Sequence, residues 1–429
     1  MKIRYISILL LAFLLLTSTF ISADEGAKTE KTTFWFGSHY TDFSDNTKKV
    51  GEYNKGENEL LPEFGLSYLS TNMNSIFRFT GHYYDDKNIF ALLNTKASDK
   101  FKASVQYRSM VKQESQDLLE NLEAREWLPA AGTMSGKMLT HEIFDPDADY
   151  STDRKELLSK ISMMLTEKNK IRFEATHRMI LKTGTEQSIS STHCFSCHMT
   201  SQTQRVDNEQ QQFEAGLDGE FSKMQVGYKF GYRSFNSKVD NAQGYYDDAK
   251  HPVNGGAGGE FGPRVSYDDG WYDINAYPKT EKISHKVKFK KHVGKGYFTG
   301  ALGYAKATNK GTDLSTDAYN SSFNYASLLN PTTRFIFKGA YSKYESDTVF
   351  IDLPDYRPTS SDSNYFDFDY TRYSVIDRKD VKLSGEIIKR INKQMTGNFK
   401  LGYDISNREN YPTTFTMDTS KHKYNYVSR

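Results

Sequence analysis

The sequence predicts an all-β protein: a transmembrane antiparallel outer-membrane β-barrel of about sixteen strands with long extracellular loops. Three observations predict this class. The composition is poor in apolar residues yet rich in aromatic ones, the only long apolar segment is at the N-terminus, and the rest alternates between apolar and charged residues. Strands of about ten residues with one apolar and one polar face are typical of membrane barrels.

The composition excludes two common classes of protein. Only 37% of the 429 residues are hydrophobic, against a usual ~45–50%, which is low for a large soluble enzyme. Yet the chain holds 29 tyrosines, 28 phenylalanines and 3 tryptophans, whereas disordered chains are poor in aromatic residues. Basic and acidic residues nearly balance, at 56 and 54, so no overall field favours nucleic acid as a partner.

The N-terminus predicts export. Residues 1–23 combine the charged Lys2 and Arg4, an apolar run at 6–20 and small residues at the end, which is typical of a secretory signal peptide; a membrane-anchoring helix is the alternative. No later segment reaches the ~18 apolar residues of a spanning helix. We therefore expect residues 24–429 to form a single barrel domain, the only other shape that satisfies the backbone in lipid.

Alternation with a period of two residues recurs along the chain. In the segment 395–405, Met, Gly, Phe, Leu, Tyr and Ile occupy one face, and mostly polar residues occupy the other. Similar alternation occurs at 101–108, 171–176, 213–218, 224–235, 286–290 and 334–341. A soluble sandwich with half-solvated strands is the alternative, but it favours turns at an even spacing of 8–12 residues.

The connections alternate between short and long. Short ones are predicted at 71–74, 97–100, 167–170, 222–223, 294–296, 330–333 and 392–394. Long ones are predicted at 44–60, 110–153, 183–203, 236–280, 309–317, 345–373 and 407–419, with a short exception at 85–87. Membrane barrels place tight turns on the periplasmic side and long loops outside, so both ends of the chain are expected in the periplasm. The final Arg429 departs from the usual aromatic ending of such barrels, so the chain is either an atypical barrel or part of a larger one.

One chemical motif stands out. The only two cysteines, Cys194 and Cys197, precede His198 in a C-x-x-C-H sequence, the attachment motif of c-type haem. It predicts one covalent haem c in a loop at 183–203, with His198 as the proximal ligand of the iron. A disulfide between the cysteines and a zinc site with His193 and His177 remain alternatives, whereas a thioredoxin-like pair would need a βαβ context. Candidates for the sixth ligand are His193, Met199, His141 and His251.

The polar face of the predicted strands is rich in basic residues. These are Arg78, Arg108, Lys229, Arg233, Lys286, Lys288, Lys290, Lys338 and Lys400. In a barrel they would line the lumen, where they suit haem propionates or carboxylates of a partner; alternatively they face water and attract small anions. One haem cannot cross a hydrocarbon core of ~30 Å, so electron transfer through this barrel would need a second redox protein in the lumen.

The chain resembles the MtrB/PioB-type outer-membrane porins of porin–cytochrome electron conduits. The resemblance rests on the signal peptide, the aromatic alternating strands, and the stretch 192–207 followed by 213–217. It implies a periplasmic multihaem c-type cytochrome inside the lumen and a second cytochrome at the outer surface. Members of the family are generally longer, and the haem motif is not a feature of all of them.

Two functions follow as hypotheses. The first is an outer-membrane sheath for a multihaem cytochrome, with one covalent haem, in a Gram-negative-type cell. The alternative is a passive diffusion porin with a loop disulfide at the two cysteines. No arrangement of serine, histidine and aspartate or of paired carboxylates stands out, so we do not expect an enzyme.

Overall fold

The structure is a computed structural model. It describes residues 28–42, 47–54, 59–119, 139–192, 197–246, 270–351, 370–372, 377–408, 414–418 and 423–427. Within these residues the chain is almost entirely β-structure. No helix in these ranges is long and apolar enough to cross a membrane.

The regular elements are as follows. They are β1 (Thr29–Tyr40), α2 (Thr47–Val50), β2 (Leu60–Thr71), β3 (Ser75–Tyr83), β4 (Ile89–Ala97), β5 (Phe101–Glu114), β6 (Leu139–Ile143), β7 (Tyr150–Thr166), β8 (Ile171–Thr192), β9 (Cys197–Phe221) and β10 (Met224–Ser237). They continue with β11 (Ala242–Tyr246), β12 (Gly270–Ile274), β13 (Thr280–Val293), β14 (Gly296–Asn309), β15 (Ser315–Asn330), β16 (Thr333–Ser346), β17 (Val349–Ile351), β18 (Tyr370–Arg372), β19 (Arg378–Arg390), β20 (Thr396–Asn407), β21 (Thr414–Asp418) and β22 (Lys423–Val427).

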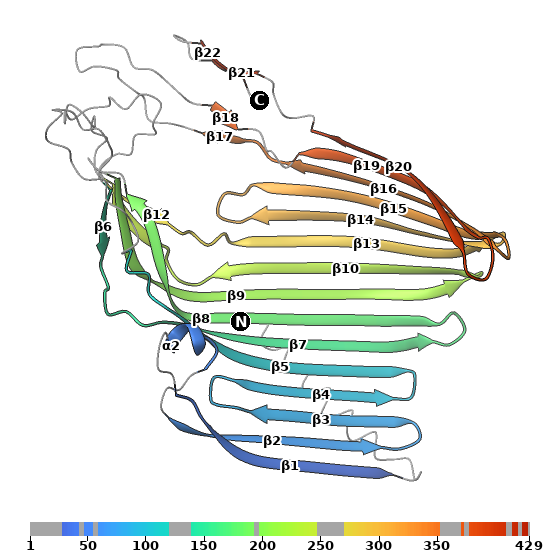
Figure 1. The fold of residues 1–429 in the computed structure, drawn as a ribbon, viewed down its shortest axis with the longest axis horizontal. Coiled ribbons are helices and arrows are strands. Elements are labelled where there is room, and N and C mark those ends of the chain that lie inside the picture. Colours follow the sequence, from blue (N-terminus) through green and yellow to red (C-terminus); the bar gives the residue numbers. More distant parts are fainter. Residues whose placement is uncertain are drawn as a thin grey trace.

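One large sheet of sixteen strands dominates the fold (Figure 1). Its path runs β1-β2-β3-β4-β5-β7-β8-β9-β10-β13-β14-β15-β16-β19-β20, and each strand is antiparallel to its neighbours. The sixteenth strand, β6, lies off this path and pairs in parallel with β9. The predicted all-β antiparallel class is therefore confirmed, with fifteen strands in the continuous path.

The tight turns lie where the sequence predicts them, and asparagines build several of them. The side-chain oxygen of Asn72 accepts hydrogen bonds from the backbone N–H groups of Asn74 and Ser75, at 3.0 and 2.5 Å. Asn392 makes the same contacts with the two residues before β20, both at 2.8 Å. Asparagine favours turns because its side chain bonds the backbone two or three residues on. Seven tight turns, with or without an asparagine, lie at one end of the sheet, which we call the tight-turn end.

The long connections lie at the opposite end, which we call the long-connection end. Two of them contain small antiparallel hairpins, β11–β12 and β17–β18. One prediction at this end is wrong. The described residues of the segment 183–203 are strand and not loop, because β8 continues to Thr192 and β9 begins at Cys197, and the two strands pair from Arg172–Asp218 up to Thr192–His198.

The two faces of the sheet differ in chemistry. Arg172 of β8 and Asp404 of β20 line the same cavity of about 1100 Å³, so the sheet curves around this face, which is concave. Register places Lys229 opposite Lys286, and Lys338 opposite Ser384, on that same face. The sequence-predicted basic residues therefore share the concave side.

The convex face is apolar in its middle and charged at its ends. On β19 it carries Val381, Leu383 and Ile387 between Lys379 and Lys389. The ten residue steps from Lys379 to Lys389 measure about 33 Å along the strand, or about 25 Å of height at a tilt of ~40°. This equals the apolar band of membrane barrels.

The sheet has two free edges. Among the described residues no backbone pair joins β1 to β20, and the two strands lie at opposite margins of the curved sheet (Figure 1). The closed barrel expected from the sequence is therefore an open, curved wall in this part of the chain.

Candidate functional site

The strands that carry the haem motif extend beyond the rest of the sheet. Pairing of β7 with β8 ends at Thr152–Gly184, and pairing of β10 with β9 ends at Ser237–Asn208. Beyond these points β8 and β9 continue to pair with each other, over residues 185–192 and 197–207, and β6 pairs with the first residues of β9. We call these residues the hairpin extension. Its β8 arm of eight residues is roughly 26 Å long.

A glycine marks the base of the hairpin extension. Gly184 has a φ of +143°, a conformation that residues with a side chain rarely adopt. A Cβ atom at this position would lie 2.1 Å from the backbone oxygen of Ser151. Only glycine therefore lets β8 pass so close to β7 at the level where the two strands separate.

The hairpin extension is among the best buried parts of the described chain. Ser188 and Ser201 are fully buried, and Val206 and Gln204 are 3% exposed; Tyr150 of β7, whose hydroxyl lies 3.4 Å from that of Thr203, is fully buried too. Most of these residues are polar, and segments distant in the sequence cover them. The buried polar groups of this region therefore need hydrogen-bond partners, because each one left unpaired lowers the stability of the fold by about 1–3 kcal/mol.

Two side chains provide much of this bonding. The Gln187 amide donates to the backbone oxygen of Asp117 and accepts from its N–H, both at 2.8 Å, and it also donates to the Ser201 hydroxyl at 2.6 Å. Asn275 donates to the buried Ser188 hydroxyl at 2.5 Å. The connections before β6 and after β12 thus bind the extension from both sides, and fix it relative to the sheet.

The haem motif lies at the tip of the hairpin extension. Cys197 and His198 are the first residues of β9, and their backbones pair with Leu139 and Thr140 of β6. His193 and Cys194 lie outside the described residues, as does His251. The motif thus spans the connection between the last residue of β8 and the first of β9.

Two of the predicted sixth-ligand candidates lie side by side. Met199 is half-buried in β9, and its backbone pairs with His141 of β6 on one side and Ser191 of β8 on the other. Nothing in the sequence indicates that β6 joins this tip. Over the described ranges, no three His, Cys, Asp or Glu residues are grouped closely enough to hold a metal ion.

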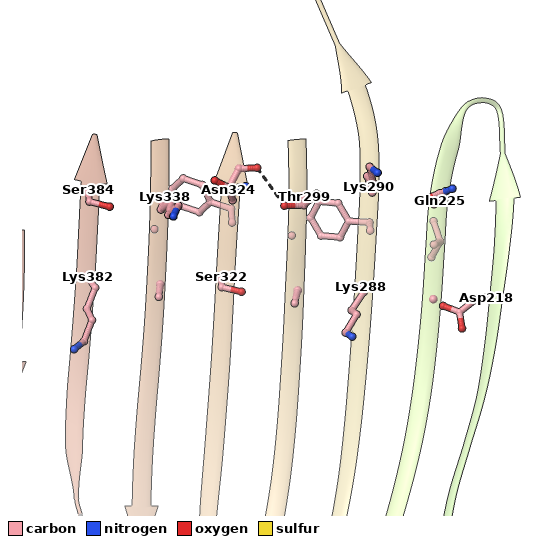
Figure 2. Close-up of a pocket in the computed structure, with 18 of the residues that line it drawn as sticks. Asp218, Gln225, Lys288, Lys290, Thr299, Ser322, Asn324, Lys338, Lys382 and Ser384 are labelled. Carbon is pink, nitrogen blue, oxygen red and sulfur yellow. Dashed lines mark hydrogen bonds between the residues drawn. The ribbon is translucent and has the colours of Figure 1, made fainter. Parts of the chain in front are cut away.

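The concave face presents a second candidate site, shown in Figure 2. Lys288 and Lys290 of β13 stand on one side and Lys338 of β16 on the other. The two strands between them carry small residues on this face: Thr299, Ala301, Ser322 and Asn324. We call this arrangement the lysine trough; it forms part of the cavity of about 1100 Å³ near the tight-turn end.

Glu174, Asp218 and Glu220 also line the cavity, yet the ion pairs around the lysine trough involve other lysines. Lys382 pairs with Asp404 at 3.0 Å and Lys229 with Glu214 at 3.3 Å, both beside the trough. Lys290 instead stands 5.0 Å from the centre of the Tyr297 ring. Within the ranges that the structure describes, Lys288 and Lys338 have no ion-pair partner. Because like charges opposite one another destabilise a sheet, such a surface favours an anionic occupant.

Comparison with known proteins gives similarity of fold alone. No family model matches the chain, and no curated protein matches it significantly. Solved structures that are similar include OmpT, an outer membrane protein of Vibrio cholerae, with 10% identity, 95% of this chain and 94% of that chain covered, and a TM-score of 0.32. An anion-selective porin from Comamonas acidovorans is 8% identical; the match covers 87% of this chain and 100% of that chain, with a TM-score of 0.27.

A third similar structure is the ferric yersiniabactin uptake receptor FyuA from Yersinia pestis. It has 9% identity, with 80% of this chain and 61% of that chain covered, and a TM-score of 0.29. At such identities and TM-scores, the similarity says nothing about what this chain binds or carries.

Proposed function

We propose that this chain forms the wall of an outer-membrane β-barrel that sheathes a multihaem c-type cytochrome, with one covalent haem c at Cys194, Cys197 and His198. The observation that carries the proposal is the C-x-x-C-H motif at the tip of a hairpin extension that polar contacts hold in place above a two-faced sheet. We also propose that the chain is a member of the MtrB/PioB-type porins, which its sequence resembles.

The convex face supports a place in a membrane. Exposed side chains there include Leu302, Phe399 and Leu401, at 54%, 67% and 69%. A soluble protein rarely exposes so continuous an apolar surface. In this proposal the lipid of the outer membrane covers the apolar band, and the flanking lysines reach the interfaces.

The concave face supports an acidic partner in the lumen. Carboxylates and haem propionates are the groups that the lysine trough would attract, since its lysines lack enough counter-charges of their own. A periplasmic multihaem cytochrome supplies both. Because the hairpin extension stands at the long-connection end, its haem would lie between the lumen cytochrome and a cytochrome at the outer surface.

The residues of the motif have the chemistry that a c-type haem needs. The thiols of Cys194 and Cys197 would add across the two vinyl groups, and a ring nitrogen of His198 would bind the iron. The bound haem would supply a one-electron carrier at the tip of the extension. The role of the chain itself is to hold that tip at a fixed height above the sheet, through the contacts of Gln187 and Asn275.

Haem staining of the denatured, purified protein, together with its intact mass, tests the covalent haem. We expect one haem per chain, which Cys197→Ser abolishes, whereas His198→Ala retains the covalent haem but changes its spectrum. His292→Ala, in an exposed residue of β13 far from the motif, is the matched control. A haem-free chain with the two cysteines joined in a disulfide would support the diffusion porin instead.

Co-purification in mild detergent tests the sheath. We expect a haem-staining cytochrome, identified by its mass, to be retained at low salt and released at high salt. Lys288→Gln with Lys338→Gln should weaken its retention. Lys100→Gln with Lys389→Gln removes the same charge away from the trough and should not. Retention that is independent of salt and of all four lysines would contradict the role of the trough.

A further inference from the structure

A short turn joins β3 to β4 at the long-connection end. The backbone N–H of Tyr84 donates to the backbone oxygen of Asn88 at 3.0 Å. The Asp85 carboxylate accepts from the backbone N–H groups of Lys87 and Asn88, both at 2.7 Å, and Asp85 is only 2% exposed. The rim of the sheet is therefore low at this point, between the longer connections that follow β1 and β5.

The connection between β1 and β2 folds over this low rim. Figure 1 shows its helix α2 beside β5 rather than beside β1 and β2. The backbone N–H of Gln113 in β5 donates to the Glu52 oxygen at 2.7 Å, and the Gln113 side chain donates to the Asn54 oxygen. The Asn88 side chain donates to the Tyr53 oxygen at 3.2 Å. Three hydrogen bonds thus hold the segment after α2 against the ends of β4 and β5.

A cavity of about 510 Å³ lies between this segment and the sheet. We call it the Arg108 pocket; the side chains that form it include Tyr53, His82, Tyr84, Phe90, Arg108 and Met110. Register places Arg108 opposite Glu156, and Glu156 opposite Arg178 of β8, so the pocket lies on the concave face. Its volume is within the range of small-molecule sites, about 300–1,000 Å³.

The charge of Arg108 is not neutralised by its neighbours. The carboxylate opposite it, Glu156, is bonded to Arg178 at 2.7 Å and to Arg154 at 2.8 Å. No described residue that lines the pocket is a carboxylate. A guanidinium presents its N–H donors in a fixed fork that matches a planar acid group. The exposed Arg108 can therefore pair with an acid group that enters the pocket.

Aromatic side chains form most of the remaining lining. His82, Phe90 and Arg108 stand in one row across three neighbouring strands, so two strand spacings of ~4.8 Å each separate His82 from Arg108. Phe90 lies in the middle of that row, and Tyr53 lines the pocket from the segment after α2. A flat ring packed against Phe90 would thus reach Arg108 with an acid group at its edge.

Contacts behind the pocket fix two of its walls. The Nε2 atom of His82 lies 2.9 Å from a carboxylate oxygen of Glu63. The ring of Tyr84 stacks on that of His39, with 3.7 Å between the ring centres and 8° between the planes. Neither Glu63 nor His39 lines the pocket. Because these contacts restrain His82 and Tyr84, little side-chain freedom is lost when a ligand binds between them.

We propose that the Arg108 pocket binds a flat aromatic anion, whose acid group pairs with Arg108 and whose ring packs against Phe90. The lysine trough attracts anions by charge, whereas the Arg108 pocket selects those that also carry a ring. The proposal requires neither a haem at the motif nor a cytochrome in the lumen, so it stands or falls independently of the proposed function.

Equilibrium dialysis of the full chain in phosphatidylcholine vesicles tests this proposal, with naphthalenesulfonate as the probe and protein-free vesicles as the blank. The probe combines fused aromatic rings with an acid group that stays ionised. We expect saturable binding, with which neither cyclohexanesulfonate nor neutral naphthalenesulfonamide competes well. Arg108→Gln should weaken binding about tenfold or more, because a hydrogen bond to a charged group is lost. Tyr53→Ala, which changes the segment after α2 and leaves the sheet intact, should also weaken it.

Arg233→Gln is the matched control, since it removes the same charge from an exposed arginine of β10 on the concave face, outside the pocket. It should leave the affinity unchanged, and the urea unfolding midpoint should be the same in all three variants. Equal weakening by the two arginine variants would overturn the proposal in favour of a general effect of charge. Equal binding of cyclohexanesulfonate would overturn the selection of a ring, and a lack of saturable binding would overturn the site itself.

Discussion

The hairpin extension continues two strands of the wall, β8 and β9, yet the extension and the wall are stabilised in opposite ways. In the extension, Ser188 and Ser201 are fully buried among polar neighbours, and side chains such as Gln187 bond to distant segments. In the wall, Leu302 and Leu401 are more than half exposed. Contacts within the chain cover the extension, whereas the wall leaves apolar side chains exposed among the described residues.

This difference shows what each region requires from outside. Hydrogen bonds within the protein satisfy the extension, so its structure depends on the residues that make them. The wall leaves apolar side chains on the convex face and under-compensated lysines on the concave face. Under the proposed function, lipid would cover the first face and water or an anionic partner the second, so charge changes should act very differently on the two faces.

The largest effect is expected for a charge placed on the convex face. Val287 lies on the convex face between Tyr228 and Leu302, in the middle of the apolar band. Val287→Arg should destabilise the membrane-inserted protein by about 2–4 kcal/mol, the cost of an arginine at the midplane of a barrel. The measurement is the shift of the urea unfolding midpoint in lipid vesicles.

Lys288→Arg is the matched control, since it places the same side chain one residue away on the concave face. Its effect should be close to zero. Equal destabilisation by the two variants would mean that both faces of β13 have the same surroundings, and would contradict the assignment of the convex face to lipid.

The sequence was sufficient to predict the wall because the wall obeys a local rule. Residues such as Phe399 and Lys400 alternate on every strand, and asparagines such as Asn392 mark the turns. The alternation also placed Lys288 and Lys338 on one face. It did not reveal the small residues between them as the base of a trough, because that depends on which strands are neighbours.

The sequence predicted a loop where the hairpin extension lies, and the reason is physical. Residues 185–192 are mostly Ser, Thr, Glu and Gln, which have no apolar alternation and resemble a solvated connection. Their strand structure depends on contacts with Asp117 and Asn275, which are about 70 or more residues distant in the chain. Such tertiary contacts override local preference and cannot be read from one segment.

An intermediate effect is expected at the base of the extension. Gly184→Ala would place a Cβ atom 2.1 Å from the backbone oxygen of Ser151, at a φ of +143°, and backbone strain of this kind costs about 1–3 kcal/mol. We expect the extension to detach from its contacts while the wall stays folded. Limited proteolysis should then cut residues 185–207 faster, with the urea midpoint of the wall little changed.

Gly385→Ala is the control for this change. A Cβ atom there meets no atom within 4 Å, so alanine should be tolerated in the wall. If Gly184→Ala left the proteolysis rate of the extension unchanged, the close approach of β8 to β7 would not be what positions the haem motif.

The smallest effect concerns acid, and it should be confined to the extension. Hydrogen bonds from the Thr203 hydroxyl and backbone N–H hold the pKa of the Asp145 carboxyl below its usual range. A carboxyl with a lowered pKa in the folded state contributes stability above its unfolded pKa of ~3.9, and this contribution is lost as the pH falls through the folded value. Because Asp145 is exposed, the effect should stay below about 1 kcal/mol.

Hydrogen exchange of the Thr203 amide should therefore be faster in Asp145→Asn than in the parent protein at pH 7, with the difference narrowing as the carboxyl becomes protonated. A difference that stayed constant down to pH 2 would show that the charge of Asp145 is not what secures the segment after β6 to the hairpin extension.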